Sequence, residues 1–453
     1  MKTATINICA VRSIHFRSDA SYHLSEGQHV QRSIASSPYP LLSIRQVADD
    51  IFIGNRARRV YVKNAKYGIP FLSSSDILKA DLDNVKLASK KYTPDIERMS
   101  LKKGWTLISR SGTIGNCAFA NAKHAQKLAS EDVIRLIPNN ILREGLIYAY
   151  LASKYGHSLL TQGTFGAVIQ HIEPAFVGSI AIPQFPESFQ QEVDDLIQKS
   201  ARLREEASDA LEYAIGYFDT LFLIPFKENC LGKVSSKEIL TSINKRFEAS
   251  FHISEGKDID KYIKEHYEWK SLGEVCSNIS RPDIFKRYYV KKGVTFLGGA
   301  DIFLATPDSE KRLSPKKTAN IGALMIKEGT ILLPRSGTIG NVAWAHAGHA
   351  QKLASEDVIR ITPNDILRAG YVYAFLASKY GKKLIQRYIF GSVIQHVEPP
   401  HLKLIPVPII DKKVMDDIHD KVMVYSSAMG KAIEYERKAI TMVEQEIEKW
   451  NKH

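Results

Sequence analysis

The chain repeats a segment of domain size, and this repeat constrains the fold more than any other feature of its 453 residues. Matching segments stand 225 residues apart, since 349 minus 124 is 225: SRSGTIGN at 109–116 with PRSGTIGN at 334–341, HAQKLASEDVIR at 124–135 with an identical copy at 349–360, and FGAVIQHIEP at 165–174 with FGSVIQHVEP at 390–399. Upstream the offset changes to 229, where RSDASYH at 17–23 matches RFEASFH at 246–252. Solenoid repeats are only about 20–50 residues long. The sequence therefore predicts two copies of one domain in tandem.

A long helical pattern follows each copy. Apolar or small residues recur at three- and four-residue spacing from Val193 to Leu221, and again from Val422 to Trp450. At 1.5 Å per residue, a helix of about 35 residues spans about 50 Å. We therefore expect a first domain over 1–186, a long helix over 187–226, a second domain over 227–410 and a long helix over 411–453. Each helix either packs on its own domain or pairs with the other helix as a spacer.

Within each copy the pattern mixes strands and helices. Short β-branched runs bounded by Gly, Asn and Pro predict strands at 105–110, 131–137 and 177–183. Between them, residues 141–160 place Leu142 and Leu146 on one face of a predicted helix. The expected fold class is mixed α/β.

The charge of the chain favours a polyanionic partner. Lys and Arg number 62 against 49 Asp and Glu, which gives a net charge of +13. The N-terminus lacks the apolar core of a signal peptide, and no run approaches the roughly 20 apolar residues of a membrane span. The four cysteines are far apart and form no metal-ligand spacing. We therefore expect a cytoplasmic protein that has no membrane segment and binds no metal.

The order of these motifs resembles the specificity subunits of type I restriction-modification systems. The resemblance rests on an arginine before a Gly-Thr-Ile-Gly turn, at Arg110 and Arg335, on a later Gly and Gln, and on closing strands AIPQFP and PVPII before the long helices. It implies two target-recognition domains whose helices pack as an antiparallel coiled-coil spacer. It also implies double-stranded DNA, a methyltransferase subunit that uses S-adenosylmethionine, and an ATP- and Mg-dependent restriction subunit as partners.

The repeated turn supplies the first candidate DNA contacts. Arg110 and Arg335 end a predicted strand, where a guanidinium can bond guanine O6 and N7 or a phosphate. The alternative is a structural ion pair, with Glu131 or Asp132 for Arg110 and with Glu356 or Asp357 for Arg335. The hydroxyl groups of the turn are further candidates: Ser111, Thr113, Ser336 and Thr338.

Two other repeated motifs carry polar side chains. In the block HAQKLASEDVIR, Lys127 and Lys352 are candidates for phosphate contacts, and Gln126 and Gln351 for adenine readout, although a solvated loop is an equal alternative. The second motif offers Gln170, His171, Gln395 and His396, for which a DNA contact or core hydrogen bonding is favoured over metal binding.

Basic runs that show no match between the copies are candidates for reading different bases. In the first copy they supply Arg58, Arg59 and Lys91, and in the second Lys286, Arg287 and Lys316. A run of charge is often only a solvated surface. In a basic chain with paired domains, DNA contact is the favoured interpretation.

No catalytic signature accompanies these motifs. The sequence has no NPPY or DPPY, no glycine-rich methyl-donor loop, no P-loop and no spaced nuclease centre. We therefore expect no catalytic, cofactor or metal residues. If the two long helices pack antiparallel, the two similar domains should bind a bipartite target with near-inverted half-sites. The alternatives are a self-contained nuclease or modifying enzyme with an unrecognised site, and an RNA-binding or dimerisation protein.

Overall fold

The computed structural model describes residues 25–56, 58–164, 171–224, 232–242 and 245–450. The chain forms two compact units, unit 1 from Met1–Glu205 with Lys431–His453 and unit 2 from Glu206–Gly430. Two long helices, α8 (Glu187–Leu221) and α16 (Lys412–Trp450), therefore each contribute to both units. Both helices were predicted from the sequence, whereas the predicted domain limits stay a prediction.

Unit 1 is an α/β unit with three small sheets. Its strands are β1 (Leu41–Ser43), β2 (Ala48–Ile53), β3 (Tyr61–Val62), β4 (Gly68–Leu72), β5 (Leu87–Ser89), β6 (Thr106–Ser109), β7 (Cys117–Phe119), β8 (Leu128–Ala129), β9 (Val133–Pro138) and β10 (Ala181–Pro183). Its shorter helices are α3 (Glu26–Ala35), α4 (Ile96–Met99), α5 (Glu144–Ala152), α6 (Lys154–Gln162) and α7 (Pro174–Ser179), with 3-10 turns η1 (Ile44–Val47), η2 (Ala65–Tyr67) and η3 (Asp76–Leu78).

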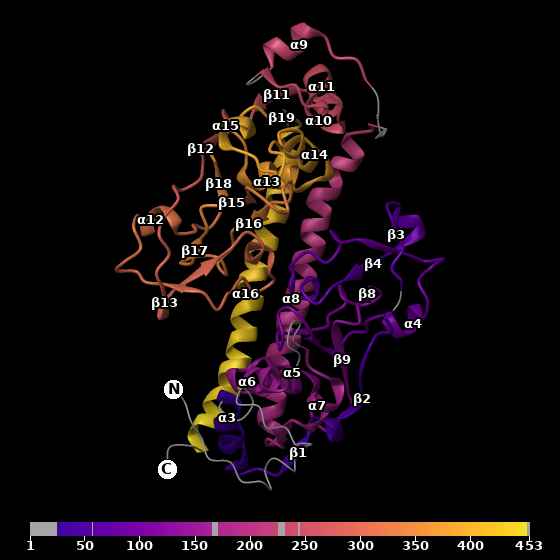
Figure 1. Ribbon diagram of the computed structural model, residues 1–453, viewed down its shortest axis with the longest axis vertical. Coiled ribbons are helices and arrows are strands. Elements are labelled where there is room, and N and C mark those ends of the chain that lie inside the picture. The colour runs from indigo at the N-terminus through magenta and orange to yellow at the C-terminus, as the bar shows by residue number, and fades with distance from the viewer. Residues whose placement is uncertain (1–24, 57, 165–170, 225–231, 243–244, 451–453) are drawn as a thin grey trace. The chain divides into compact units, whose positions relative to one another are not determined.

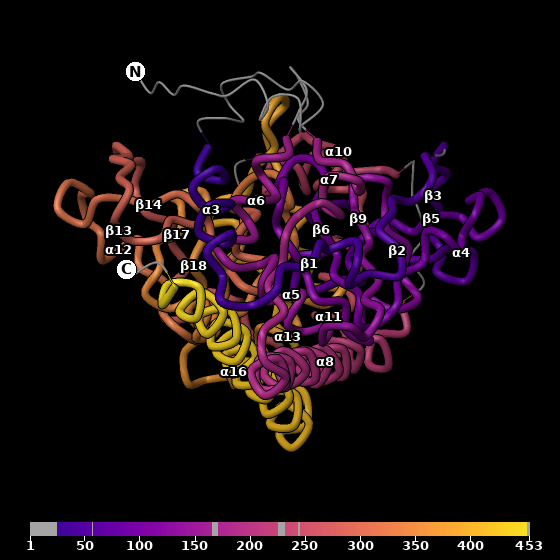
Figure 2. Tube along the Cα trace, turned by 90° about the horizontal axis from the view of Figure 1, so that it is seen from below, coloured from indigo at the N-terminus to yellow at the C-terminus, as the bar shows by residue number. Residues whose placement is uncertain are grey.

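The sheets of unit 1 have different roles. An antiparallel sheet in the order β2-β9-β6-β7 forms the centre, and β1 pairs with β10. The third sheet, β3-β5-β4-β8, joins the parallel pair β4 and β8 to an antiparallel edge. In Figures 1 and 2, β9 lies between α5 and this third sheet, which places β3, β5 and α4 at one end of the unit.

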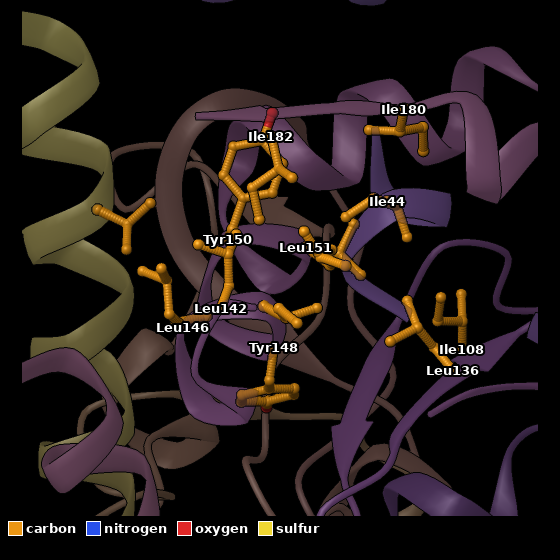
Figure 3. Close-up of a cluster of buried hydrophobic side chains, with 14 of the residues drawn as sticks. Ile44, Ile108, Leu136, Leu142, Leu146, Tyr148, Tyr150, Leu151, Ile180 and Ile182 are labelled. Carbon is orange, nitrogen blue, oxygen red and sulfur yellow. The ribbon is translucent and has the colours of Figure 1, made fainter. Parts of the chain in front are cut away.

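The core of unit 1 forms around α5. Figure 3 shows side chains of α5, among them Leu146 and Tyr150, packed with residues of the central sheet and of β10. Tyr150 is fully buried and donates its hydroxyl to the Ala181 carbonyl at 2.6 Å. The helix predicted over 141–160 is in fact two helices, because Ser153 is extended and caps α6 through Gly156 N–H. The strand predicted over 177–183 also begins later, since residues up to Ser179 belong to α7.

Unit 2 repeats this arrangement. Its strands are β11 (Glu268–Ser271), β12 (Cys276–Ser280), β13 (Tyr289–Leu297), β14 (Arg312–Leu313), β15 (Ile331–Pro334), β16 (Ala343–Trp344), β17 (Leu353–Ala354), β18 (Val358–Pro363) and β19 (Pro406–Ile409). Its helices are α9 (Ser236–Thr241), α10 (Ala249–His252), α11 (Glu255–His266), α12 (Ile321–Leu324), α13 (Ala369–Ala377), α14 (Lys379–Arg387) and α15 (Pro399–Leu402), with the 3-10 turn η5 (Asp301–Phe303). The sheets β12-β18-β15-β16, β14-β13-β17 and β11-β19 correspond to those of unit 1.

The long helices contact each other within each unit. In unit 1, Phe185, just before α8, packs near Trp450 at the end of α16, with 5.9 Å between ring centroids. Further along α8, Ser200 donates to the Ala432 carbonyl at 2.8 Å. Because later residues of α8 meet earlier residues of α16, the two helices are antiparallel in unit 1. In unit 2, the Lys421 ammonium lies 5.2 Å from the Tyr213 ring.

Candidate nucleic-acid interface

Two adjacent carboxylates just before β9 anchor two arginines from different loops. Glu131 bonds the Arg59 guanidinium at 2.6 Å, and Asp132 lies 4.0 Å from that of Arg110. The Asp132 carbonyl also accepts from the Arg110 backbone N–H at 2.9 Å. This acidic pair therefore joins the first basic run to the glycine turn.

Unit 2 holds the same arrangement. Glu356 bonds Arg287 at 2.6 Å, and Asp357 lies 3.6 Å from Arg335. Its carbonyl accepts from the Arg335 N–H at 2.7 Å. The acidic pair and its two arginines are thus a property of both copies.

The shortest ion pair of each turn arginine is with a carboxylate that the sequence did not suggest. Arg110 contacts Glu173 at 2.5 Å, and Arg335 contacts Glu398 at 2.8 Å. Both glutamates stand in the repeated Glu-Pro that ends the FGxVIQH motif, which was the available signal. The ion pairs favour the structural alternative for these arginines, and direct base contact stays a prediction.

Glu398 has a second arginine partner. Arg281 lies 3.2 Å from its carboxylate. Burial alone would raise the pKa of Glu398, but hydrogen bonding and charge attraction from Arg335 and Arg281 hold this pKa below its usual value. The carboxylate therefore stays ionised.

The glycine turn presents a backbone surface to solvent. Gly112 and Gly337 have φ values of +75° and +78°, and a Cβ built on either meets no atom within 4 Å. Thr113 and Thr338 of the same turns are exposed, while Ser111 and Ser336 are half-buried. In unit 1 the Thr113 hydroxyl is held 2.9 Å from that of Ser109.

A short hairpin lies beside this turn in unit 2. Phe390 and His396 exchange two backbone hydrogen bonds of 3.0 and 2.9 Å, and His396 also bridges to Ser336. Gln395 is exposed in the hairpin loop, and His396 is half-buried. The structure thus brings these two predicted residues next to the turn. In unit 1, His171 is half-buried, and Gln170 lies outside the described residues.

The block HAQKLASEDVIR forms a turn whose polar groups bond largely to other groups of the protein. Gln126 and Gln351 adopt left-handed backbone, with φ of 67° and 61°. Lys127 is largely buried, and its ammonium bonds the Lys123 carbonyl at 2.7 Å and Asp83 at 3.0 Å. The Lys352 ammonium bonds the Pro307 carbonyl. These contacts favour a positioning role for the lysines.

Lysines and tyrosines gather at the sheet β3-β5-β4-β8 of unit 1, which we call the outer sheet. We call this set the lysine–tyrosine surface, which comprises Tyr61, Lys66, Tyr67, Lys86, Lys90, Lys91 and Tyr92. Three of its ammonium groups lie over tyrosine rings, at 5.0 Å for Lys86 and Tyr61, 5.7 Å for Lys66 and Tyr67, and 5.3 Å for Lys91 and Tyr92.

The strand pairing brings the first basic run to this surface. The Ser89 N–H bonds the Val60 carbonyl at 2.9 Å, so the segment after β5 lies beside the segment before β3. Lys91 is therefore placed close to the run that holds Arg58 and Arg59. All three side chains are exposed.

Unit 2 has a corresponding surface with different residues. The ammonium groups of Lys286 and Lys317 lie 5.3 and 6.0 Å from the Tyr288 ring. The Ser314 N–H bonds the Tyr288 carbonyl at 2.9 Å, which brings the segment of Lys316 to that of Lys286. Both units thus expose cations and aromatic rings at the equivalent sheet edge, a combination that suits nucleic-acid binding.

The two basic runs are not wholly unmatched, contrary to the sequence interpretation. The Arg59 guanidinium lies 5.2 Å from the Phe71 ring, and that of Arg287 lies 5.3 Å from Phe296. With their equivalent glutamates, these arginines are the same anchor in both copies. Sequence comparison missed it because the offset between them is 228 rather than 225 (287 minus 59).

Two buried basic residues also escaped the sequence analysis. Arg135 and Arg360 end the identical block, and each donates to four backbone carbonyls, including Ala129 and Ala354 at 2.5 and 2.7 Å. Burial lowers the pKa of both guanidinium groups to about 10. The only sequence signal for these residues is that both copies have an arginine at this position. This signal does not distinguish a structural role from a DNA contact.

The histidines of the same block are structural too. His124 and His349 bond the Ile77 and Ile302 carbonyls at 3.2 and 2.9 Å, and burial lowers their pKa to about 4. Within the described ranges, no group of three or more His, Cys, Asp or Glu residues could hold a metal ion. Nor do the described helices include one with the length and apolarity that crossing a membrane requires.

Comparison with known proteins identifies one family. The type I restriction modification DNA specificity domain matches residues 48–203 and again 264–420. No curated protein matches the chain. Among solved structures, the chain is similar to the type I S subunit from M. genitalium (14% identity, 91% of this chain, 96% of the other, TM-score 0.32). It is also similar to the HsdS subunit from Thermoanaerobacter tengcongensis (12%, 91%, 97%, 0.29).

Proposed function

The chain belongs to the family of type I restriction-modification DNA specificity proteins, and we propose that it recognises a bipartite target with one domain on each half-site. The observation that carries the proposal is the repeated interface. Both units present an exposed glycine turn and an anchored arginine beside a surface of lysines and tyrosines. Two equivalent surfaces suit two similar half-sites.

Each interface divides into two kinds of contact. Lysine ammonium groups neutralise phosphates and set the register on the duplex, while side chains that differ between units read base edges. Arg58, Lys91, Lys286 and Lys316 are exposed and available for such contacts. Arg59 and Arg287 hold the basic loops in place through their ion pairs.

The long helices act as an antiparallel coiled-coil spacer between domains 1–186 and 227–410. The antiparallel contacts within unit 1 and the Tyr213–Lys421 contact within unit 2 support this arrangement. An antiparallel pair gives the domains a pseudo-twofold relation, so similar domains read similar sequences in opposite directions. The target is then two near-inverted half-sites.

Catalysis belongs to partner subunits. The family membership supports assembly with a DNA methyltransferase that uses S-adenosylmethionine, and with a restriction subunit that uses ATP and Mg²⁺. Copurification of the tagged chain from its host tests the assembly, which would be contradicted by a chain that always emerges alone. The pure chain should bind duplex DNA with Mg²⁺ and leave it intact, whereas cleavage would support the alternative of a self-contained nuclease.

The methylated sequence of the host genome tests the target. Sequencing with and without the gene should reveal one motif that depends on it, made of two related halves in inverse orientation. Two wholly unrelated halves would contradict the proposed symmetry, although not the role in DNA specificity.

A further inference from the structure

The chain that forms the lysine–tyrosine surface of unit 1 is three residues longer than the chain that forms the corresponding surface of unit 2. Tyr61-Val62 corresponds to Tyr289-Val290 with an offset of 228, whereas Gly68 corresponds to Gly293 with an offset of 225. Unit 1 therefore has three additional residues between these landmarks. They fall between two strands of the sheet edge, at the surface that carries the candidate DNA contacts.

In unit 1 the additional residues form an ordered projection. The Asn64 side chain accepts from the Lys66 N–H at 2.8 Å, which caps η2. On the other side, Lys90 donates its backbone N–H to the Tyr67 carbonyl at 2.9 Å and its ammonium to the Lys66 carbonyl at 3.1 Å. The loop is thus held from within and from the strand beside it.

In unit 2 the same connection is shorter, and the residues on its two sides pair with β14 as their counterparts in unit 1 pair with β5. Residues 289–297 form the single strand β13, whose register shifts so that both Tyr289 and Val294 face Leu313. A Cβ on Gly293 would stand 2.3 Å from the Leu313 carbonyl oxygen, so the backbone passes too close for any side chain. Only Lys291 and Lys292 occupy the turn, and no aromatic residue corresponds to Tyr67.

The projection carries side chains suited to duplex DNA. Tyr67 is 58% exposed although its ring is large and apolar, and Lys66 lies over that ring. A phenol hydroxyl and an ammonium group both bond phosphates or base edges. Holding them on a rigid loop lowers the entropy cost of binding.

We infer that residues 63–67 contact the DNA duplex at a position that unit 2 does not reach, so that the two half-sites are bound unequally. This inference rests on the proposed function, because it assumes that the surface faces DNA. The first domain then contacts more of the DNA duplex than the second domain does, in addition to the contacts that both domains make.

The test compares variants of the full chain in complex with its methyltransferase. One variant is Tyr67→Ala with Lys66→Ala, which removes only exposed side chains. A second lacks residues 64–66 and so has the loop length of unit 2. A third inserts Asn-Ala-Lys between Lys291 and Lys292, and Lys102→Ala serves as an exposed control. Hydroxyl-radical footprints and the methylated motif are recorded for each.

The first two variants should shorten the footprint on one half-site only, by about one or two base pairs, and weaken binding about tenfold. The inserted variant should lengthen the footprint on the other half-site. If Tyr67 reads a base, the motif also loses one specified position in the first half. A footprint on the first half-site that is unchanged in the double variant overturns the inference. Failure of the proposed symmetry is distinguishable, because it shows in the motif of the unaltered protein.

Discussion

The central sheet and the outer sheet of each unit have diverged to different extents. In the central sheet, β9 and β18 follow the same acidic pair, carry the same buried arginine and pair in the same way with β6 and β15. At the outer sheet, the loop after β3 differs in length, and the exposed Tyr67 of unit 1 has no aromatic counterpart in unit 2. The difference teaches that residues which bury polar groups are kept, while exposed residues beside them change. A recognition domain can therefore alter its contacts without altering its core.

The largest effect on the stability of the central sheets is expected when the buried arginines are replaced. Arg135→Met and Arg360→Met each leave four carbonyl groups without their donor, so we expect a loss of about 3–5 kcal/mol in the unfolding free energy of the affected unit. Urea unfolding measures it. The equivalent exposed controls Lys102→Ala and Lys327→Ala should change stability by less than about 0.5 kcal/mol. If Arg135→Met were as stable as its control Lys102→Ala, the structural role of Arg135 would be contradicted.

The carboxylates that hold the turns should have the next largest effect. Glu398→Gln removes the ionised partner of Arg335 and Arg281, at an expected cost of about 1–3 kcal/mol. Because the folded-state pKa of Glu398 is lowered, its contribution is fully present above the unfolded pKa of about 4.3 and is lost as pH falls through the lower folded value. Thermal melts of unaltered protein and variant should therefore differ most above the unfolded pKa and converge as pH falls from it through the lower folded pKa. Parallel melting curves throughout this range would contradict the assignment.

The variants Arg59→Ala and Arg287→Ala test whether these two arginines anchor the basic loops of the two units in the same way. Each guanidinium is partly exposed, so the loss of the ion pair and the ring contact should cost only about 1 kcal/mol. DNA affinity should fall by a similar factor for both variants, because each releases one basic loop. Gel-shift titration at fixed salt provides the measurement, and an effect confined to one of the two would show that the anchors are not equivalent.

The smallest expected effect concerns the exposed lysines. Lys91→Ala and Lys316→Ala should each reduce the slope of log affinity against log salt by about 0.9, because each removes one phosphate contact. Lys102→Ala and Lys327→Ala serve again as controls. Slopes identical to those of the controls would exclude these lysines from the interface.

The architecture was predictable because its signals are long. The repeat extends over whole domains, and the helical patterns that begin near Val193 and Val422 extend over many turns, so local errors do not hide them. Details that depend on one residue were missed. The break at Ser153, where a capping hydroxyl ends one helix and begins another, is an example.

The candidate site was predictable only in part, because sequence does not give the partners of a charge. The sequence predicted that Arg110 and Arg335 form an ion pair or contact a base. Their shortest ion pairs, with Glu173 and Glu398, join residues 63 positions apart in the sequence. Arg59 and Arg287 were taken as unmatched because three additional residues separate them from the main offset. Tertiary contacts, not patterns, decide these roles.

The discontinuous composition of unit 1 has a consequence for synthesis. Ala439, Val443 and Ile447 of α16 complete its apolar cluster beside Val193 and Ile197 of α8. Residues 206–430, which are 225 residues (430 minus 205), are made between these two parts. At about 5–20 residues per second, the ribosome leaves this apolar seam uncovered for about 10–45 s. A chain released before α16 is made would leave this seam uncovered, so unit 1 cannot complete its core until α16 has been synthesised.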